Sequence, residues 1–329
     1  MSALITTDVA EAAAALRNGG LVAFPTETVY GLGADASNDA AVERIYTAKG
    51  RPVVHPVILH VSDVAALDTW ADHVPDYARD LAASHWPGPL TLVLERRAGL
   101  GERAAGGSST IGLRSPSHPV ARALLAAFGG AIAAPSANRF GRVSATTAAH
   151  VVAELAEVLD PSTDRILDGG PCDVGVESTI VDCTGPNPRL LRSGQVTVEQ
   201  VETTTGRSVE AADGVTPAPG TLAAHYAPEA RVVLTDGAGV DDLLAALGAE
   251  HPGATLGLLA CDVVTDRPGV VRLAAPVDAD GYARVLYAAL RAADDAALDV
   301  VVAVPPPDEG VGSAVADRLR RAARGTMAS

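Results

Sequence analysis

The sequence predicts an α/β protein of two domains. The chain has 329 residues, which suffices for two ordinary domains, and 48% of them are hydrophobic while only 3% are aromatic, so the cores are expected to consist mainly of alanine, valine and leucine. Short apolar runs, typical of buried strands, alternate with segments typical of helices. A stretch rich in glycine and proline, residues 206–229, separates a first domain, residues 1–205, from a second, residues 230–329.

The first domain begins with a helix over residues 8–18, where Asp8 and Glu11 have the spacing of a capping box and Gly19-Gly20 ends the helix. Asp39 is expected to cap a helix that runs to about Thr47. Ser62 or Asp63 is expected to cap a short helix, and further helices are predicted over residues 75–84, 119–127, 147–159 and 197–204. Strands are predicted over residues 21–24, 57–61, 90–94, 111–114, 131–134, 165–167, 177–182 and 190–194, and the polar and apolar residues of 177–182 are expected to alternate outward and inward.

The second domain has a more regular pattern. Strands are predicted over residues 231–234, 255–259, 270–273 and 300–304, and helices near 239–246, 280–293 and 312–323. This alternation predicts a small, doubly wound parallel sheet. The domain contains no Walker A sequence, and Gly237-Ala238-Gly239 lacks the third glycine of a dinucleotide-binding motif.

The most informative stretch of the first domain runs from residue 24 to residue 56 and contains the only lysine of the chain, Lys49. A single lysine among arginines indicates a position that needs a compact ammonium, the alternative being a solvated surface residue. Pro52 favours an extended Arg51, and in an extended segment Lys49 and Arg51 point to the same side. We therefore expect the two cations to form an anion site. Earlier in this stretch, Gly31 and Gly33 are expected to allow a tight turn or close approach to a ligand.

Other candidate residues stand where predicted strands end. His60 ends a strand eleven residues after Lys49 and is either a structural residue or a ligand. Arg114 and Arg192 also end strands, where α/β proteins tend to place ligand-binding groups. The loop Pro135-Ser136-Ala137-Asn138 could cradle phosphate oxygens or could be an ordinary turn. Together these residues favour binding a polyphosphate and stabilising charge at phosphorus, with assistance from a metal ion.

Composition and missing motifs exclude several classes of function. The net charge is −15, which argues against broad binding to nucleic acids or anionic membranes. The three cysteines have no CxxC spacing, the N-terminus does not resemble a signal peptide, and no apolar run approaches the ~20 residues of a membrane span, so we expect a cytoplasmic protein without membrane association. The G-x-G-x-x-A pattern at residues 31–36 does not directly follow its strand, which argues against an NAD site. Motifs for a P-loop, for zinc hydrolysis and for serine or thiol nucleophiles are absent from the sequence.

Six motifs in order carry a family resemblance: PTETVYGLG (25–33), KGRPxxxP (49–56), the strand ending in His60, PSAN (135–138), ESTIVD (177–182) and LLRSG (190–194). This series resembles the YrdC-like family of L-threonylcarbamoyladenylate synthases, and PGxxxxHYAP (219–228) is similar to its two-domain branch. The resemblance implies an open, twisted N-terminal α/β sheet with a concave cationic cleft, followed by a smaller C-terminal Rossmann-like domain.

The resemblance also implies a nucleotidyltransferase. Such an enzyme condenses L-threonine, bicarbonate (or CO2) and ATP into threonylcarbamoyl-AMP and pyrophosphate. The product feeds N6-threonylcarbamoyladenosine formation in tRNA, next to the anticodon, through separate tRNA threonylcarbamoyl transferase proteins. Mg²⁺ is expected with ATP because polyphosphate charge normally requires it, whereas no metal-ligating residues and no stable nucleic-acid binding are expected.

By motif position the resemblance assigns roles to thirteen residues. Lys49 and Arg51 would face the phosphates as catalytic residues. L-threonine would be bound by Thr28, His60, Arg114, Ala134 (through its backbone) and Ser178. ATP would be bound by Arg51, His55, Thr110, Ser136, Ser144, Arg192 and Tyr226. Two departures from the family pattern stand out: His55 replaces a polar amide, and residues 221–224 lack the usual basic residues.

Two alternatives to this enzyme remain at the level of sequence. One is an RNA-binding regulatory module that uses the same cationic cleft, which the negative net charge disfavours. The other is a maturation domain that uses carbamoyl phosphate, like larger relatives. Those relatives carry zinc-finger and acylphosphatase segments, and neither is visible in this sequence.

Overall fold

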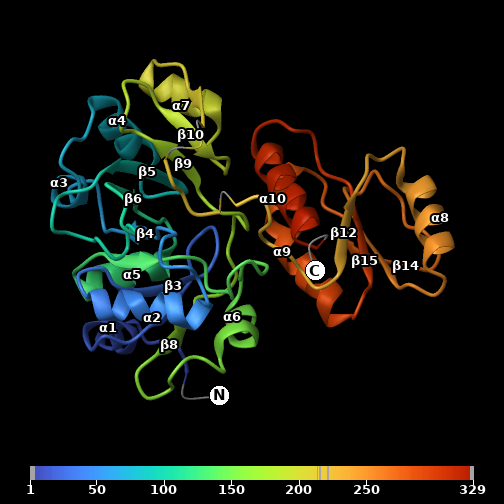
Figure 1. Cartoon of the computed structure of the whole chain (residues 1–329), viewed down its shortest axis with the longest axis horizontal. Helices are drawn as coiled ribbons and strands as arrows, with labels where there is room; N and C mark the ends of the chain where they lie inside the picture. The colour runs from blue at the N-terminus through green and yellow to red at the C-terminus, as the bar shows by residue number, and fades with distance from the viewer. Residues whose placement is uncertain (1–3, 213, 215, 221, 327–329) are drawn as a thin grey trace. The chain divides into compact units, whose positions relative to one another are not determined.

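The computed structural model describes residues 4–212, 214, 216–220 and 222–326, so positions 213, 215 and 221 of the predicted linker lie outside the described residues. The chain forms two compact units (Figure 1). The first comprises Met1–Phe140, Ser144–Asp173 and Glu177–Thr221, and the second comprises Gly141–Val143, Val174–Val176 and Leu222–Ser329. Two short segments of the predicted first domain thus belong to the second unit, and the first part of the predicted linker belongs to the first unit.

A mixed sheet forms the centre of the first unit, and its described strands follow the order β1-β8-β2-β3-β7-β4-β6-β5-β9-β10-β11. Apolar runs of three to six residues form most of these strands, as predicted. Their bounds are β1 Ile5–Thr6, β2 Val22–Phe24, β3 Gly31–Asp35, β4 Ile58–His60, β5 Leu90–Glu95, β6 Thr110–Arg114, β7 Ile132–Ala134, β8 Arg165–Leu167, β9 Thr179–Asp182, β10 Arg189–Arg192 and β11 Glu210–Ala211.

Five of the seven described helices of the first unit begin at a side-chain cap, whereas α3 and α4 follow Ala65 and Pro75 and have none. Asp8 accepts hydrogen bonds from two N–H groups at the start of α1, and Thr197 and Gln200 form a capping box at α7. The predicted cap Asp39 is wrong, because the side chain of Asn38 caps α2 and Asp39 is its first residue. The bounds are α1 Val9–Arg17, α2 Asp39–Lys49, α3 Ala66–Trp70, α4 Asp76–His85, α5 Pro119–Phe128, α6 Ala148–Leu155 and α7 Val198–Thr205.

The two faces of this sheet are covered differently. One face carries Leu59, Leu113 and Ala133, which pack in the largest apolar cluster together with residues of α2, α3, α4, α6 and α7. The other face is covered by α1 and α5 over β2 and β7. Over β4, β5 and β9 that second face carries a smaller apolar cluster, which includes Ala218 of the predicted linker. The candidate site lies on this part of the face.

Two predictions about individual strands are wrong. Residues 179–182 do not alternate between exposed and buried, since all four residues of β9 are buried. Gly31 and Gly33 lie within strand β3 and pair with Phe24 and Val22 of β2, so the expected tight turn is wrong, whereas close approach to a ligand stays a prediction. A Cβ atom on Gly33 would lie 2.6 Å from Cγ2 of Ile132 and 2.8 Å from Cε1 of Phe24, so glycine permits the close packing of β3.

The second unit confirms the predicted parallel sheet. Its strands β12 Arg231–Leu234, β13 Leu256–Leu259, β14 Val270–Ala274 and β15 Val300–Ala303 follow the order β12-β15-β13-β14, and each pair is parallel. Helix α8 (Val240–Glu250) packs on one apolar cluster with β13 and β15. Helices α9 (Ala279–Asp295) and α10 (Val311–Thr326) pack against each other.

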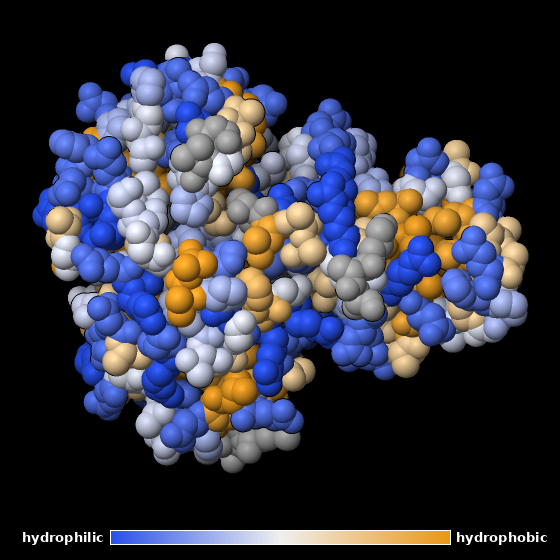
Figure 2. Space-filling model, in the orientation of Figure 1, coloured by the Kyte–Doolittle hydropathy of each residue, from blue (hydrophilic) through white to orange (hydrophobic). Residues whose placement is uncertain are grey.

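Hydrophilic residues cover most of the face shown in Figure 2. Seven large hydrophobic side chains of the described residues are exposed, and only Val53 and Val54 are adjacent in the chain. Among the described helices, none has both the length and the apolar character required to cross a membrane.

Candidate active site

The pairing of strands β4, β6 and β7 places several predicted residues on one face of the first sheet. His60 pairs with Arg114, and Ile58 pairs with both Gly112 and Ala134. Paired residues share a face, as do alternate residues along a strand. His60, Arg114 and Ala134 therefore lie on the same face, and by the same alternation so does Thr110.

Strands β5, β9 and β10 extend this face. Val93 of β5 pairs with Gly112 of β6, so Val93 and its alternate neighbour Thr91 lie on the same face as Arg114. Thr91 pairs with Ile180 of β9, which pairs with Arg192 of β10. These six strands thus form one surface, and four of them, β4, β6, β7 and β10, bring predicted residues for both substrates to it.

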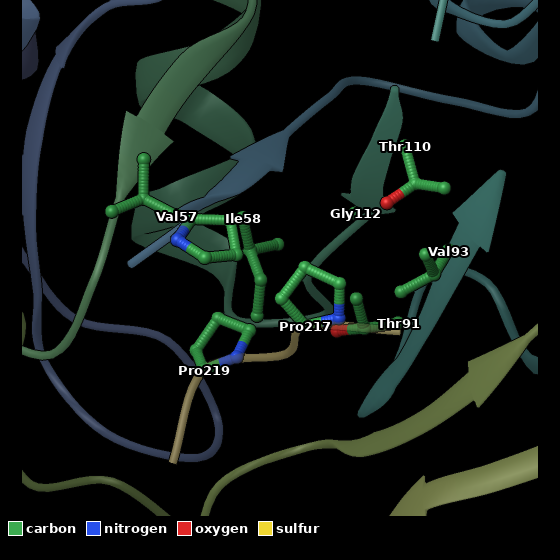
Figure 3. A pocket seen from close by; sticks show the side chains of 9 residues that line it. Val57, Ile58, Thr91, Val93, Thr110, Gly112, Pro217 and Pro219 are labelled. Carbon is green, nitrogen blue, oxygen red and sulfur yellow. The ribbon is translucent and has the colours of Figure 1, made fainter. Parts of the chain in front are cut away.

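The segment before position 221 lies against this surface. Pro217 and Pro219 line a small cavity of about 10 Å³ together with Ile58, Thr91 and Thr110 (Figure 3), which is room for about one water molecule. Ala218 belongs to an apolar cluster with Ile58, Val93, Ile180 and Leu191. The carbonyl of Pro219 accepts a hydrogen bond from Nη1 of Arg192 at 2.9 Å. Residues 217–219 therefore cover part of this surface.

Arg114 forms a buried ion pair with Glu27. Its Nη2 lies 2.7 Å from Oε1 of Glu27, and the two side chains are 4% and 7% exposed. The Arg114 Nε donates to the carbonyl of Gly88, while Oε2 of Glu27 accepts the N–H of Ser117 at 3.0 Å. Burial opposes ionisation of Glu27, but the charge and hydrogen bond of Arg114 outweigh it and lower the pKa of this carboxyl. Both groups are therefore charged.

His60 is neutral and buried beside this pair. Burial, and secondarily the charge of Arg114, lowers the pKa of His60 to about 3. Its ring meets Phe24 edge to face at 5.6 Å between centroids. In the part of the chain that the structure describes, its Nδ1 atom is buried and has no hydrogen-bond partner, which leaves it able to bond a polar group of a ligand.

Thr28 is fully buried, and its Oγ1 lies 2.9 Å from Oγ1 of Thr26. Since the Thr26 hydroxyl donates to the carbonyl of Val29 at 2.6 Å, it can accept the proton of the Thr28 hydroxyl. The orientation of Thr28 is therefore fixed by the turn that follows β2.

Lys49 is a buried link between two loops. It is the last residue of α2, and its Nζ donates to the carbonyls of Ser136, at 2.6 Å, and Asn138. Burial and the charge of Arg51 lower its pKa well below the ordinary value. The prediction that Lys49 and Arg51 share an extended segment is wrong, because Lys49 is helical and Gly50 between them is left-handed with φ of 63°.

Arg51 is held inside its own loop. Its Nη2 donates to the carbonyl of Pro56 at 2.9 Å and its Nε to that of His55 at 3.3 Å. The guanidinium lies 5.7 Å from the ring centroid of Phe140, and the His55 ring lies 5.6 Å from the same ring. The N–H of Phe140 in turn donates to the carbonyl of Lys49. Both cations therefore lie beside the 135–140 loop.

Glu177 and Ser178 form hydrogen bonds with two further predicted residues, Ser144 and Arg192. The Ser144 hydroxyl donates to Oε1 of Glu177 at 2.7 Å. The Ser178 hydroxyl accepts from Nη2 of Arg192 at 3.0 Å and lies 2.8 Å from Oγ1 of Thr91. This network fixes Ser144, Ser178 and Arg192 through one short segment before β9.

Two predicted residues remain: Thr110, which lies on the shared sheet face, and Tyr226, which has other surroundings. Thr110, at the start of β6, has its hydroxyl 2.9 Å from that of Ser108. Tyr226 belongs to the second unit, where its ring stacks on Tyr287 at 5.7 Å and the guanidinium of Arg318 lies 5.5 Å away. Its φ of 62° is unusual for a residue other than glycine. The other twelve predicted residues belong to the first unit.

Sequence reasoning missed the roles of Glu27, Thr91 and Glu177. All three are buried polar residues that hold predicted site residues. The signal was present for the two glutamates, since each lies within a motif that carries the family resemblance, and a carboxylate is rarely buried without a partner. Across the described residues, no cluster of three or more His, Cys, Asp or Glu side chains is placed to hold a metal ion.

Comparisons with known proteins match both units. Residues 14–194 match a Sua5/YciO/YrdC family model described as telomere recombination, and residues 196–324 match one described as the C-terminal domain of threonylcarbamoyl-AMP synthase. Threonylcarbamoyl-AMP synthase of Bacillus subtilis is 39% identical over 97% of this chain and 94% of the relative. That of Pyrococcus abyssi is 39% identical over 94% of this chain and 92% of the relative.

Solved structures agree with the sequence relatives. The structure of P. abyssi Sua5 complexed with L-threonine has a TM-score of 0.87 and 37% identity, and the match covers 97% of this chain and 94% of that one. A variant of the same Sua5 has a TM-score of 0.88 and 35% identity, with coverage of 98% and 96%. The likeness therefore extends over nearly the whole chain.

Proposed function

Because the chain belongs to the threonylcarbamoyl-AMP synthase family, we propose that it condenses L-threonine, bicarbonate (or CO2) and ATP into L-threonylcarbamoyladenylate and pyrophosphate. The observation that carries this proposal is the gathering of predicted threonine and ATP residues on one sheet face. The product would serve N6-threonylcarbamoyladenosine modification of tRNA, next to the anticodon, and downstream tRNA threonylcarbamoyl transferase proteins would consume it. These steps would place the enzyme in the cytoplasm.

The reaction consists of two bond-forming steps. The threonine amine attacks CO2, forms the C–N bond and loses a proton, which yields a carbamate. A carbamate oxygen then attacks the α-phosphorus of ATP, and the bond from that phosphorus to the β-bridging oxygen breaks as pyrophosphate leaves. Since both attacking groups come from substrates, the main task of the protein is to align them and to stabilise negative charge.

The threonine end lies at Arg114. We assign its guanidinium to the substrate carboxylate, because a fork of N–H donors suits a carboxylate. Neutral His60 offers the unpaired Nδ1 atom to a hydroxyl or amine of the substrate. Thr28, Ser178 and the backbone of Ala134 complete the polar wall. The P. abyssi relative complexed with L-threonine supports threonine as the substrate.

The phosphate end lies at the loops of residues 49–56 and 135–140. Arg51 is assigned to the departing pyrophosphate, and Lys49 contributes its positive charge and fixes the Ser136–Asn138 backbone. The remaining ATP contacts are assigned to His55, Thr110, Ser136, Ser144 and Arg192. We also assign Mg²⁺ to the reaction. The surrounding donors are mainly hydroxyls and cations, which suits an ion bound by ATP phosphates and water rather than by a cage of carboxylates.

This proposal is tested with Arg51→Ala and a surface control, Arg97→Ala. Arg97 forms a half-exposed ion pair with Asp72 at 3.4 Å. Threonine-dependent pyrophosphate release should fall about a hundredfold or more in the Arg51 variant, as for loss of other groups that stabilise charge in a transition state, and should be unchanged in the control. Near-normal turnover by folded Arg51→Ala would contradict the site. Salt-sensitive binding of duplex RNA without any turnover would instead favour the RNA-binding alternative.

A further inference from the structure

We propose that Glu27 is a positioning residue for L-threonine, which holds Arg114 so that one edge of its guanidinium faces the substrate carboxylate. The hydrogen bonds of Glu27 in the described structure join it to Arg114 and Ser117, and neither of these residues is assigned to ATP. This inference rests on the role proposed above for Arg114.

The contacts of Glu27 fix Arg114 from one side. Oε1 lies 2.7 Å from Nη2 of Arg114, and Oε2 accepts the Ser117 N–H at 3.0 Å, so both carboxylate oxygens are used. The Gly88 carbonyl accepts from Nε of Arg114 at 3.3 Å. Within the described residues, Nη1 of Arg114 has no hydrogen-bond partner. One edge of the guanidinium is therefore occupied and Nη1 is left for another acceptor.

Charge explains why a carboxylate stands beside a residue that binds carboxylates. Arg114 is 3% exposed, and a lone guanidinium at that depth would lack compensation before the substrate arrives. An unpaired cation would also attract phosphate and other small anions, which ATP and pyrophosphate supply at the same sheet face. The negative charge of Glu27 neutralises the pair and repels multiply charged anions, and this leaves a site for a single carboxylate.

The test compares Glu27→Gln with Glu177→Gln in the full-length protein. Each variant removes one buried carboxylate from the first unit, but Glu177 holds Ser144, which is assigned to ATP. Glu27→Gln should raise KM for L-threonine by about ten- to a hundredfold, as expected when a buried ion pair loses one partner, and should change KM for ATP less than twofold. Glu177→Gln should instead raise KM for ATP and leave KM for L-threonine nearly unchanged.

A second measurement separates positioning from general support. Wild-type protein should bind L-threonine much more tightly than L-threoninamide, which lacks the carboxylate charge, and Glu27→Gln should reduce this ratio at least fivefold. Inorganic phosphate should compete with L-threonine more strongly in the variant. If Glu27→Gln does not fold, Glu27→Asp, which withdraws the charge by one methylene, should shift the same two readouts in the same direction.

Arg114→Lys distinguishes failure of this inference from failure of the proposed function. If Arg114→Lys leaves KM for L-threonine unchanged, the assignment of Arg114 is wrong. If it raises that KM while folded Glu27 variants retain the normal KM and threonine-to-threoninamide ratio, Glu27 is not a positioning residue. The double variant Glu27→Gln/Arg114→Lys should be less impaired than the product of the two single effects, because both act on one contact.

Discussion

At the scale of single residues, the site depends on buried charges whose partners come from distant parts of the chain. Lys49 donates to two carbonyls almost ninety positions further along the sequence. Arg114 pairs with a glutamate of a preceding motif. Each of these cations fixes a second segment, so its removal should affect both folding and ligand binding.

Lys49→Met tests this double role. It removes the donor from the carbonyls of Ser136 and Asn138 and leaves them buried, so the free energy of unfolding should fall by about 2–4 kcal/mol. Arg79→Met removes a half-exposed ion pair with Asp68 and should change the free energy of unfolding by less than about 0.5 kcal/mol. Urea unfolding of both variants measures the difference. Unchanged stability in Lys49→Met would show that the ammonium does not hold the 135–138 loop.

His60 gives the protein a defined sensitivity to acid. Its pKa is about 3 in the folded chain and 6.5 in a model peptide, so the unfolded chain takes up a proton first as pH falls. The folded chain therefore has its full stability with respect to His60 above pH 6.5, and this part of the stability is lost progressively as pH falls from 6.5 toward 3. Between pH 7 and pH 5 the wild type should therefore lose about 2 kcal/mol more stability than His60→Asn. Parallel urea titrations of the two proteins at pH 7 and pH 5 measure this difference. Equal losses of stability would mean that a negatively charged partner near His60 offsets the effect of burial on its pKa.

At the scale of elements, strand β3 depends on the absence of a side chain at Gly33. In Gly33→Ala, the added Cβ would meet Ile132 and Phe24 at distances below 3.0 Å. We expect a loss of about 1–3 kcal/mol. Gly185→Ala is the matched control, since its nearest atom would be the carbonyl oxygen of Asn187 at 3.7 Å. Thermal unfolding of the two variants should differ clearly, and a Gly33→Ala protein as stable as wild type would mean that β2 and β7 can separate at little cost.

The elements themselves were largely predictable from the sequence. Apolar runs such as residues 90–94 and capping residues such as Asp8 and Thr197 act locally, so local pattern identified them. Strand order and register were not predictable, because they depend on pairs such as His60 with Arg114 that are 54 positions apart. For the same reason the position of Lys49 in a helix beside the 135–138 loop, the packing of Gly33 and the role of Glu27 appeared only in the structure.

At the scale of the whole molecule, the two units match two family models in series. In the first unit, six strands supply one face with the predicted residues, and residues 217–219 cover part of it. Its positive side chains are local exceptions in a chain of net charge −15. Such a chain is suited to bind small anions in a pocket but not a long polyanion over its surface.

The most direct test of the account is pyrophosphate release by the full-length protein, measured with ATP, Mg²⁺ and bicarbonate and with each amino acid in turn. Release should require L-threonine, should stop when bicarbonate is removed, and should produce threonylcarbamoyl-AMP in equal amount. Release that proceeds without an amino acid, or equally with many of them, would contradict the claim that the sheet face aligns threonine with ATP.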